Sequence, residues 1–209
     1  MGNACPCGLS LDTVGGLYTD AKHFKGSGLA GTRMVADGPG EKLTVVGTDD
    51  GAAFWAVAGR VTDKAEGSLV LDFSPKGGPA DLAGKYSLEY EKILWSDGNA
   101  WVPALSVPTT QGKQSGARGD VGGLYFDAKH FSSTGSVKGL RFVAAAGDTV
   151  TLVGSDDGIQ FWGLTGSFTD KASGIISVDF TPKGGPAGLS GTFNGDKIEW
   201  KDGNSWQRA

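Results

Sequence analysis

The sequence predicts an all-β protein that is a tandem duplication of a small antiparallel meander, and two observations lead to this prediction. The first is composition, because the 209 residues include 36 glycines, more than twice the usual share of about 7%. Since each glycine inside a helix costs roughly 1 kcal/mol relative to alanine, long helices are not expected. The ten Phe, six Trp and four Tyr require burial, so the chain is not a disordered glycine-rich linker.

The second observation is an internal repeat at an offset of 107 residues. The segment VGGLYTDAKHF at residues 14–24 recurs as VGGLYFDAKHF at residues 121–131, with one difference in eleven positions. DFSPKGGPA at residues 72–80 recurs as DFTPKGGPA. WSDGNAW at residues 95–101 recurs as WKDGNSW, where the offset has fallen to 105. The order and spacing of these matches indicate duplication of one structural unit.

The repeat divides the chain into four parts. Residues 1–13 form a flexible N-terminal tail, 14–102 the first β repeat, 103–120 a linker, and 121–209 the second β repeat. The linker segment is rich in Pro, Ser, Thr, Gln and Gly and has no apolar period, which is typical of linkers.

Alternating side chains predict the strands of each repeat. In residues 54–61, and again in 161–168, large side chains alternate with small or polar ones, the period-two pattern of a half-buried strand. Residues 69–73 and 176–180 show the same alternation, and Ile93 and Trp95 share a face in the next segment. The Trp side chains on these inward faces are expected in the core.

Two motifs predict the turns between strands. Asp97-Gly98-Asn99 is a tight-turn sequence, after which Trp101 starts the returning strand. KGGP at residues 76–79 forces another turn, because Gly supplies positive φ and Pro fixes the exit. About six to eight short strands per repeat predict an antiparallel sandwich or small barrel. Two separate barrels and one pseudo-twofold β domain both fit this pattern.

Charge and apolar patterning exclude several classes of function. The net charge is −4 and no run of Lys or Arg appears, so nucleic acid is not an expected partner. No apolar stretch approaches the roughly 18 residues of a membrane span. The start of the sequence lacks the pattern of a signal peptide, and an intracellular, cytoplasmic location is expected.

The N-terminus offers candidate lipidation sites. Gly2 could accept myristate, and Cys5 or Cys7 palmitate, which together would supply the two signals for peripheral membrane association. Pro6 departs from the myristoylation pattern, which has Ser or Thr at this position. An unmodified flexible tail is the alternative.

Titratable residues shared by the repeats give no clear catalytic cluster. His23 and His130 occupy equivalent places, each near an Asp, and could form a metal pair if the copies faced each other. A structural hydrogen bond to Asp20 or Asp127 is the favoured interpretation, because zinc needs three or four ligands and no cluster supplies them. The shared aspartates could also include a glycosidase pair, although turn formation explains most of them. They are Asp20, Asp49, Asp50, Asp63, Asp72 and Asp97, with partners Asp127, Asp156, Asp157, Asp170, Asp179 and Asp202.

Trp101 and Trp206 follow the DGN turns and could be partly exposed. An aromatic platform beside Asp and Asn side chains is what a sugar-binding site requires, whereas a cross-strand Trp pair in a hairpin would give the same pattern. The ligand-binding candidates are Trp101, Trp206, Asp97, Asn99, Asp202, Asn204, Tyr18, His23, Tyr125 and His130.

The motifs DF[ST]PKGGP and [IL]xWxDGNxW resemble a small repeat domain found in uncharacterised proteins of microalgae and other marine protists. That domain opens with GxYxD and closes with DGNxW, so residues 16–101 and 123–206 would each be one unit. The resemblance covers most of the chain and implies a microalgal or protist source. It implies no catalytic residues, because no activity is assigned to the family.

These observations favour a non-enzymatic binding or assembly module, acting as a peripheral subunit of a larger complex. The alternative is a lectin-like carbohydrate-binding protein with one site per repeat, and a weaker alternative is a small hydrolase that uses shared aspartates. No cofactor or metal is expected, and the expected partner is a protein or a glycan.

Overall fold

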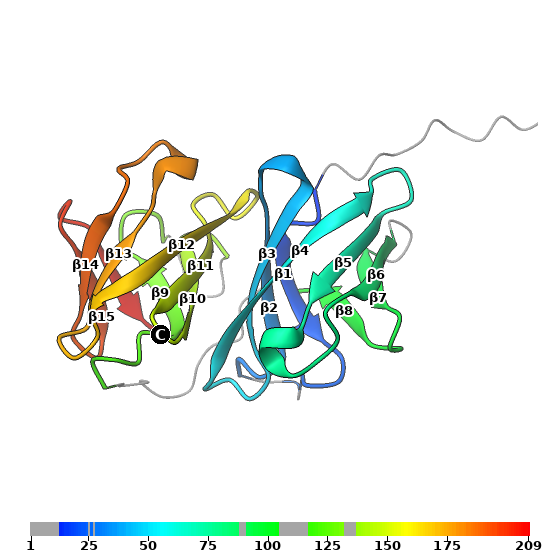
Figure 1. The fold of residues 1–209 in the computed structure, drawn as a ribbon, viewed down its shortest axis with the longest axis horizontal. Helices are drawn as coiled ribbons and strands as arrows, with labels where there is room; N and C mark the ends of the chain where they lie inside the picture. The colour runs from blue at the N-terminus through cyan, green and yellow to red at the C-terminus, as the bar shows by residue number, and fades with distance from the viewer. Residues whose placement is uncertain (1–12, 25, 27, 88–90, 105–116, 132–136) are drawn as a thin grey trace, which may run out of the picture.

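The chain forms two closed β-barrels of eight strands each (Figure 1). The computed structural model describes residues 13–24, 26, 28–87, 91–104, 117–131 and 137–209. The first barrel consists of β1 (Gly16–Asp20), β2 (Thr32–Asp37), β3 (Lys42–Thr48), β4 (Phe54–Asp63), β5 (Ser68–Asp72), β6 (Leu82–Ser87), β7 (Lys92–Trp95) and β8 (Ala100–Pro103).

The second barrel repeats this arrangement strand by strand. It consists of β9 (Gly123–Asp127), β10 (Leu140–Ala146), β11 (Thr149–Ser155), β12 (Phe161–Asp170), β13 (Ile175–Val178), β14 (Leu189–Phe193), β15 (Lys197–Trp200) and β16 (Ser205–Arg208). Three short 3-10 turns complete the described structure: η1 (Pro39–Glu41), η2 (Ser74–Lys76) and η3 (Thr181–Lys183).

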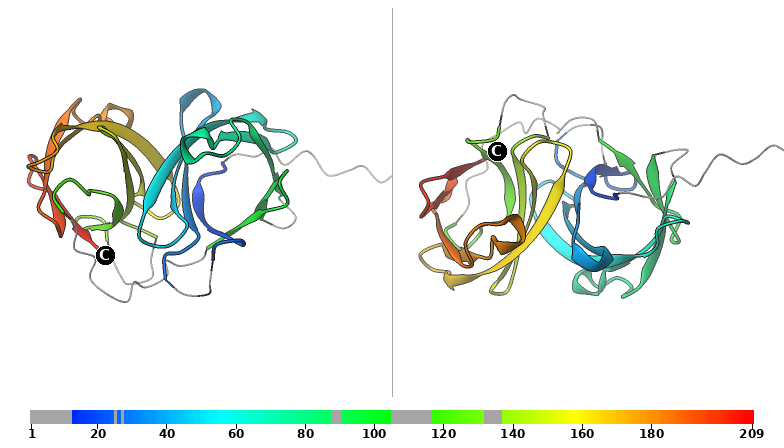
Figure 2. Two further views of the ribbon diagram at one scale, coloured as in Figure 1. Left: turned by 60° about the horizontal axis from the view of Figure 1, so that its bottom comes forward. Right: turned by 90° about the horizontal axis from the view of Figure 1, so that it is seen from above.

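Each barrel is an antiparallel meander. Every strand pairs with its neighbours in sequence, and β8 closes on β1 as β16 closes on β9. The barrels appear as closed rings lying side by side when viewed along their axes (Figure 2). The predicted all-β duplication is therefore confirmed, and the question between one domain and two is answered by two complete barrels.

The alternating side chains fill the interior of each barrel. Val57 and Val61 of β4 point inward with Leu69 and Leu71 of β5, and Trp55 of β4 packs against the same core. The long strand β4 must bend around the barrel, and a register shift lies between Val61 and Asp63. These positions carry the same inward–outward alternation that the sequence shows.

A glycine permits the tight curvature at this point. A Cβ on Gly59 would lie 2.1 Å from the carbonyl oxygen of Val70 in the neighbouring strand, and the equivalent Gly166 is equally crowded by Ser177. No larger residue fits between these strands without moving the backbone. Part of the glycine excess is thus a requirement of barrel closure.

The two barrels share a third apolar core between them. It contains residues on the outer faces of β2–β3 and β10–β11, among them Met34, Val46, Phe142 and Val153, all fully buried. The rings of Phe54 and Phe142 meet edge to face with centroids 5.6 Å apart. This sheet-on-sheet packing holds the barrels together as one body.

Within the described residues, no helix is long and apolar enough to cross a membrane.

Candidate functional site

A pocket opens at one end of each barrel. In a meander, alternate loops lie at the same end, so the loops that follow β1, β3, β5 and β7 come together. These loops carry the DAKH, DDG, FSPKGGP and DGN motifs of the repeat. The pocket volume is about 260 Å³ in the first barrel and about 230 Å³ in the second. The best-matched segments of the two repeats therefore form one end of the fold.

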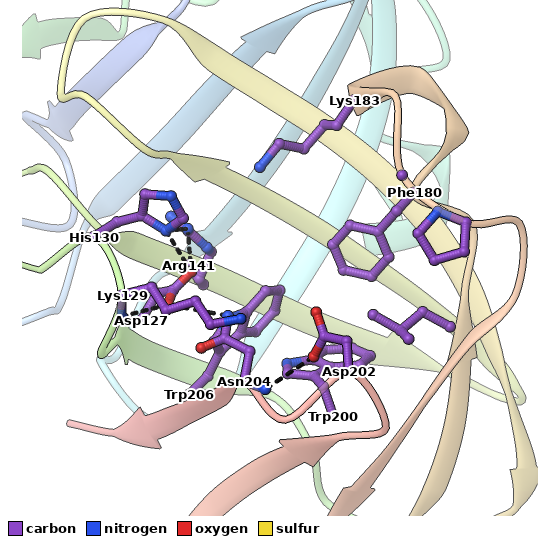
Figure 3. A pocket seen from close by; sticks show the side chains of 13 residues that line it. Asp127, Lys129, His130, Arg141, Phe180, Lys183, Trp200, Asp202, Asn204 and Trp206 are labelled. Atoms are coloured by element: carbon purple, nitrogen blue, oxygen red, sulfur yellow. Dashed lines mark hydrogen bonds and ion pairs between the residues drawn. The ribbon is translucent and has the colours of Figure 1, made fainter.

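The same residue types line both pockets. All 13 residues around the first pocket have an identical residue at the equivalent place in the second. Figure 3 shows the second pocket, in which His130, Arg141 and Asp127 lie opposite Phe180 and Lys183 of the η3 loop. The two sites are chemically the same.

A buried arginine lies at the base of the first pocket. The side chain of Arg33 is 1% exposed, and its Nη2 lies 2.7 Å from Oδ2 of Asp20 and 2.6 Å from Oδ1 of Asp49. Its Nη1 donates to the carbonyl oxygens of Thr32 and Thr48. Arg33 on β2 thereby connects the end of β1 to the loop that follows β3.

Lys76 extends this network to the loop after β5. Its Nζ lies 2.6 Å from Oδ2 of Asp49 and 3.8 Å from the centre of the Trp55 ring. The guanidinium carbon of Arg33 lies over the same ring at 4.7 Å. Trp55 therefore contacts both cations, and its cation–π contact with Lys76 helps to hold the FSPKGGP loop over the pocket.

The second barrel reproduces this network. Nη2 of Arg141 lies 2.6 Å from both Asp127 and Asp156, and Nζ of Lys183 lies 2.6 Å from Asp156. Lys183 contacts the Trp162 ring at 3.9 Å. Burial lowers the pKa of Lys183, and its ion pair with Asp156 opposes that effect.

The buried carboxylates stay ionised. Burial raises the pKa of Asp20, but the charge of Arg33 and hydrogen bonds from Asn99, His23 and the Lys22 backbone outweigh it, so the pKa is lowered. The pKa of Asp127 is lowered in the same way, because the charge of Arg141 and the hydrogen bonds to the carboxylate outweigh the effect of burial. A general acid needs a raised pKa, so neither carboxylate suits that role.

The structure places a possible set of metal ligands around this arginine. Asp20, His23 and Asp49 each offer a ligand atom, and these atoms lie within 4.8 Å of one another. Nη2 of Arg33 already lies among them, 3.4 Å from Nδ1 of His23 and in contact with both carboxylates. The arginine thus supplies the positive charge that a metal would supply, and the donor set does not fit an additional cation.

Each histidine is oriented by its aspartate. Nδ1 of His23 lies 3.1 Å from Oδ2 of Asp20, and Nδ1 of His130 lies 2.9 Å from Oδ2 of Asp127. This confirms the predicted structural hydrogen bond. We assign the hydrogen to Nδ1, which leaves Nε2 as an acceptor. The alternative of a metal pair between the copies is wrong, because the two histidines belong to different pockets.

Aromatic rings form the apolar wall of the pocket. Trp95 and Trp101 meet with ring centroids 4.7 Å apart, and Phe73 packs edge-on against both. The expectation that Trp101 and Trp206 are partly exposed is wrong, since each is 2% exposed. The loop after β5 or β13 covers them, and only a small part of each ring borders the pocket.

Several buried indole N–H groups in this wall have no hydrogen-bond partner among the described residues. They belong to Trp95 in the first barrel and to Trp200 and Trp206 in the second. An unpaired buried donor costs about 1–3 kcal/mol, so its occurrence in both walls needs an explanation. These nitrogens are themselves inaccessible to solvent, as are the unpaired indole nitrogens of Trp55 and Trp162, so a ligand in the pocket does not reach them.

The DGN turns form the outer rim. Asp97 accepts a hydrogen bond from the backbone of Asn99, as predicted for a turn, and pairs with Lys22 at 2.9 Å. Nδ2 of Asn99 donates to Asp20 at 2.9 Å. In the second barrel, the equivalent Lys129 and Asp202 lie beyond ion-pair distance of each other. The mouth of the first pocket is therefore bridged, and that of the second is not.

Most of the predicted ligand-binding residues come together in these pockets. Those present are His23, Asp97, Asn99, Trp101, His130, Asp202, Asn204 and Trp206.

Tyr18 and Tyr125 lie elsewhere, in the barrel cores. Their hydroxyls donate to the carbonyl oxygens of Val14 and Val121, at 2.6 and 2.7 Å. Burial raises the pKa of both tyrosines. The lipidation candidates Gly2, Cys5 and Cys7 fall outside the described residues.

The central arginines were not found from the sequence. Arg33 and Arg141 are 108 residues apart, whereas the motifs on either side match at 107. One residue more separates Phe131 from Gly139 than separates Phe24 from Gly31, so a comparison at fixed offset misses the pair. A gapped comparison would have found it.

Two other pocket residues were assigned only to turns. Asp50 does form the predicted turn, accepting hydrogen bonds from the backbones of Ala52 and Ala53. Its neighbour Asp49 instead pairs with Arg33 and Lys76. Lys76 itself was interpreted only as part of a turn motif. Charge pairing between loops that are distant in sequence gives no local signal.

Comparison with models of known protein families and with the sequences of curated proteins gives no match. The function must therefore be argued from the two pockets themselves.

Proposed function

We propose that this protein is a non-enzymatic binding module that takes one neutral, hydroxyl-rich ligand of the carbohydrate class in the mouth of each barrel. The observation that carries the proposal is the identity of the two pockets. All 13 lining positions agree, while buried positions inside the barrels differ, such as Leu43 against Val150 and Val57 against Leu164. The pockets are thus more alike than the cores that support them.

A purely structural role does not explain this agreement. Lys22 and Asp97 on the rim have side chains 48% and 43% exposed, and His23 is 42% exposed. Exposed positions of this kind tolerate change with little effect on stability. Their retention in both copies supports contact with a common ligand.

The balance of charge favours a neutral ligand. Arg33 and Lys76 neutralise Asp20 and Asp49, and Lys22 neutralises Asp97. The second pocket contains the same three acids and three bases. Each pocket thus carries no net charge, which favours a ligand that is neutral overall.

The remaining surface suits a sugar. Phe73 and the small exposed parts of Trp95 and Trp101 give one side of the pocket an apolar surface, against which the C–H groups of a sugar can lie. Nε2 of His23 and the free lone pairs of Asp97 can accept hydrogen bonds from hydroxyl groups, and Lys22 can donate. A volume near 260 Å³ is slightly below the range of drug-sized pockets, about 300–1,000 Å³. It fits one sugar ring at the end of a longer chain.

The hydrolase alternative finds less support. Asp20 is saturated by hydrogen bonds and has a lowered pKa. Asp72 and Asp179 cap the turns that follow them, accepting from the backbones of Ser74 and Thr181. None of these carboxylates has the raised pKa of a general acid.

An array of neutral and acidic glycans, followed by calorimetric titration of those that bind, tests the proposal. We expect neutral glycans to bind with two sites per chain. Binding restricted to sulfated or sialylated glycans, or no binding to any glycan, would contradict it.

Substitution at both rims localises the binding. We expect the fourfold variant His23→Ala, Asp97→Asn, His130→Ala, Asp202→Asn to lose at least tenfold in affinity. The matched control is Asp63→Asn with Asp170→Asn, since these aspartates cap turns at the opposite barrel ends. Equal losses in both variants would place binding outside the pockets.

Assembly, localisation and source remain separate proposals. A role as a subunit of a larger complex, a cytoplasmic location, membrane association through Gly2, Cys5 and Cys7, and a protist source rest on the sequence alone. The mass of the protein purified from its source tests the acylation, because myristate and palmitate each add a defined increment. In the described residues only Leu94, Val102 and Ile159 are large exposed apolar side chains, and they do not add support for a docking face.

A further inference from the structure

We infer that the two pockets make this protein a bivalent cross-linker, which joins two separate glycan-bearing surfaces and does not bind one surface through both sites. This inference rests on the proposed function. It is carried by the relative orientation of the barrels, which the interface between them fixes.

The interface places the pocket end of one barrel against the opposite end of the other. Phe54 starts β4 at the pocket end of the first barrel, and Gly122 precedes β9 at the opposite end of the second. A Cβ on Gly122 would lie 3.7 Å from Cβ of Phe54. The equivalent contact is also made, because a Cβ on Gly15 would lie 3.5 Å from Cβ of Phe161. The two contacts are equivalent under a pseudo-twofold rotation that exchanges the barrels.

The pockets consequently open in opposite directions. The η2 and η3 turns, which border the two pockets, lie at the bottom and the top of the molecule in Figure 1. The strands of both barrels lie between these two turns, so the two pockets do not face the same side of the molecule.

The packing prevents the barrels from reorienting. Ten buried residues from both barrels form the shared core, and Phe142, Val153 and Met34 within it are fully inaccessible. At Gly163 the second barrel approaches so closely that an added Cβ would lie 2.9 Å from Thr44. The packing between the barrels, and not the linker between the repeats, therefore sets the distance between the two pockets.

Opposed sites have a specific consequence for multivalent binding. Two sites raise the apparent affinity for one surface only when both can engage it at once. Here the geometry forbids this on a flat surface, so binding to a coated plane has the affinity of one site. Two particles, however, can each occupy one pocket, and particles that carry many sugars will be joined into aggregates.

The experiment uses beads coated with yeast mannan, galactan or dextran, together with flat sensor surfaces carrying the same coats. On at least one coat we expect the full-length protein to bind the sensor with an affinity independent of sugar density, and to agglutinate the beads. His23→Ala with Asp97→Asn, and separately His130→Ala with Asp202→Asn, each disable one pocket. Either variant should still bind the sensor but lose agglutination.

The outcomes separate the two proposals. Sensor binding without agglutination, an affinity that rises with sugar density, or agglutination that survives in a one-pocket variant would overturn the cross-linking and leave the binding function standing. Failure to bind all three coats in both formats would overturn the cross-linking and count against the neutral-glycan function. The control Asp63→Asn with Asp170→Asn should behave as the unmodified chain in both formats.

Discussion

The buried arginine at the base of each pocket is the residue on which the site depends most. Replacing Arg33 with methionine keeps much of the volume but leaves the Asp20 carboxylate buried without its cation. Breaking a buried ion pair in this way costs about 3–5 kcal/mol. We predict a loss of this size in the free energy of unfolding, measured by urea denaturation with circular dichroism. Arg60→Met, at an exposed position of β4, is the control, and an equally small loss in both variants would contradict the prediction.

The same network makes stability depend on pH. The pKa values of Asp20 and Asp49 are lowered: burial opposes this, but Arg33 and, for Asp49, Lys76 outweigh it. A carboxyl with a lowered pKa in the folded state stabilises the fold above its unfolded pKa, about 3.9. That contribution is lost as the pH falls through the folded pKa, because the unfolded chain then binds more protons.

We therefore predict a flat free energy of unfolding from pH 7 to about 5 and a steady fall below pH 4. Denaturation in urea at each pH measures it. The fall should be smaller for Asp49→Asn with Asp156→Asn, which removes two of these groups. If the free energy of unfolding fell as steeply in that variant as in the unmodified chain, the prediction would be contradicted and other carboxyl groups would cause the pH dependence.

At the scale of elements, the loop after β5 is held down by one side chain. Nζ of Lys76 joins Asp49 and the face of Trp55, while the loop itself exposes most of its residues. We predict that Lys76→Met with Lys183→Met increases amide hydrogen exchange in residues 73–81 and 180–188, with little effect on the strands.

Exchange measured by mass spectrometry after proteolysis checks this. Lys85→Met is the control, because Lys85 also makes an ion pair, with Glu66, but far from the pocket. Unchanged exchange in the two loops would show that the lysines do not anchor them.

Local patterns predicted the strands and turns because their physical causes are local. The alternation around Trp55 reflects inward and outward faces of one strand, and Asp97 caps the turn to which it belongs. The exposure of Trp101 was misjudged because its cover comes from the loop after β5, about 25 residues away in sequence. The Arg33 network was missed for the same reason, since it joins four segments that only the closed barrel brings together.

At the scale of the whole molecule, the core between the barrels should couple their stabilities. Phe142 is fully buried there and packs on Phe54 of the first barrel. Replacing a buried Phe with Ala costs about 3–5 kcal/mol. We predict that Phe142→Ala increases the exchange rates of the slowly exchanging backbone amides in the strands of both barrels.

Phe193→Ala is the matched control, because Phe193 is equally buried but lies inside the second barrel. It should raise exchange in the strands β9–β16 far more than in β1–β8. Similar patterns in the two variants would indicate that the shared core does not couple the barrels.

The central claim is that a neutral saccharide occupies both barrel mouths, and all six tryptophans lie in or beside these mouths. The most direct measurement is therefore an NMR titration that follows the indole N–H signals. We predict that a binding neutral oligosaccharide shifts the signals of Trp95, Trp101, Trp200 and Trp206, and leaves the amides of Gly67 and Gly174 at the opposite ends unchanged. Shifts confined to those opposite ends, or indole signals that stay fixed while the saccharide binds, would contradict the claim.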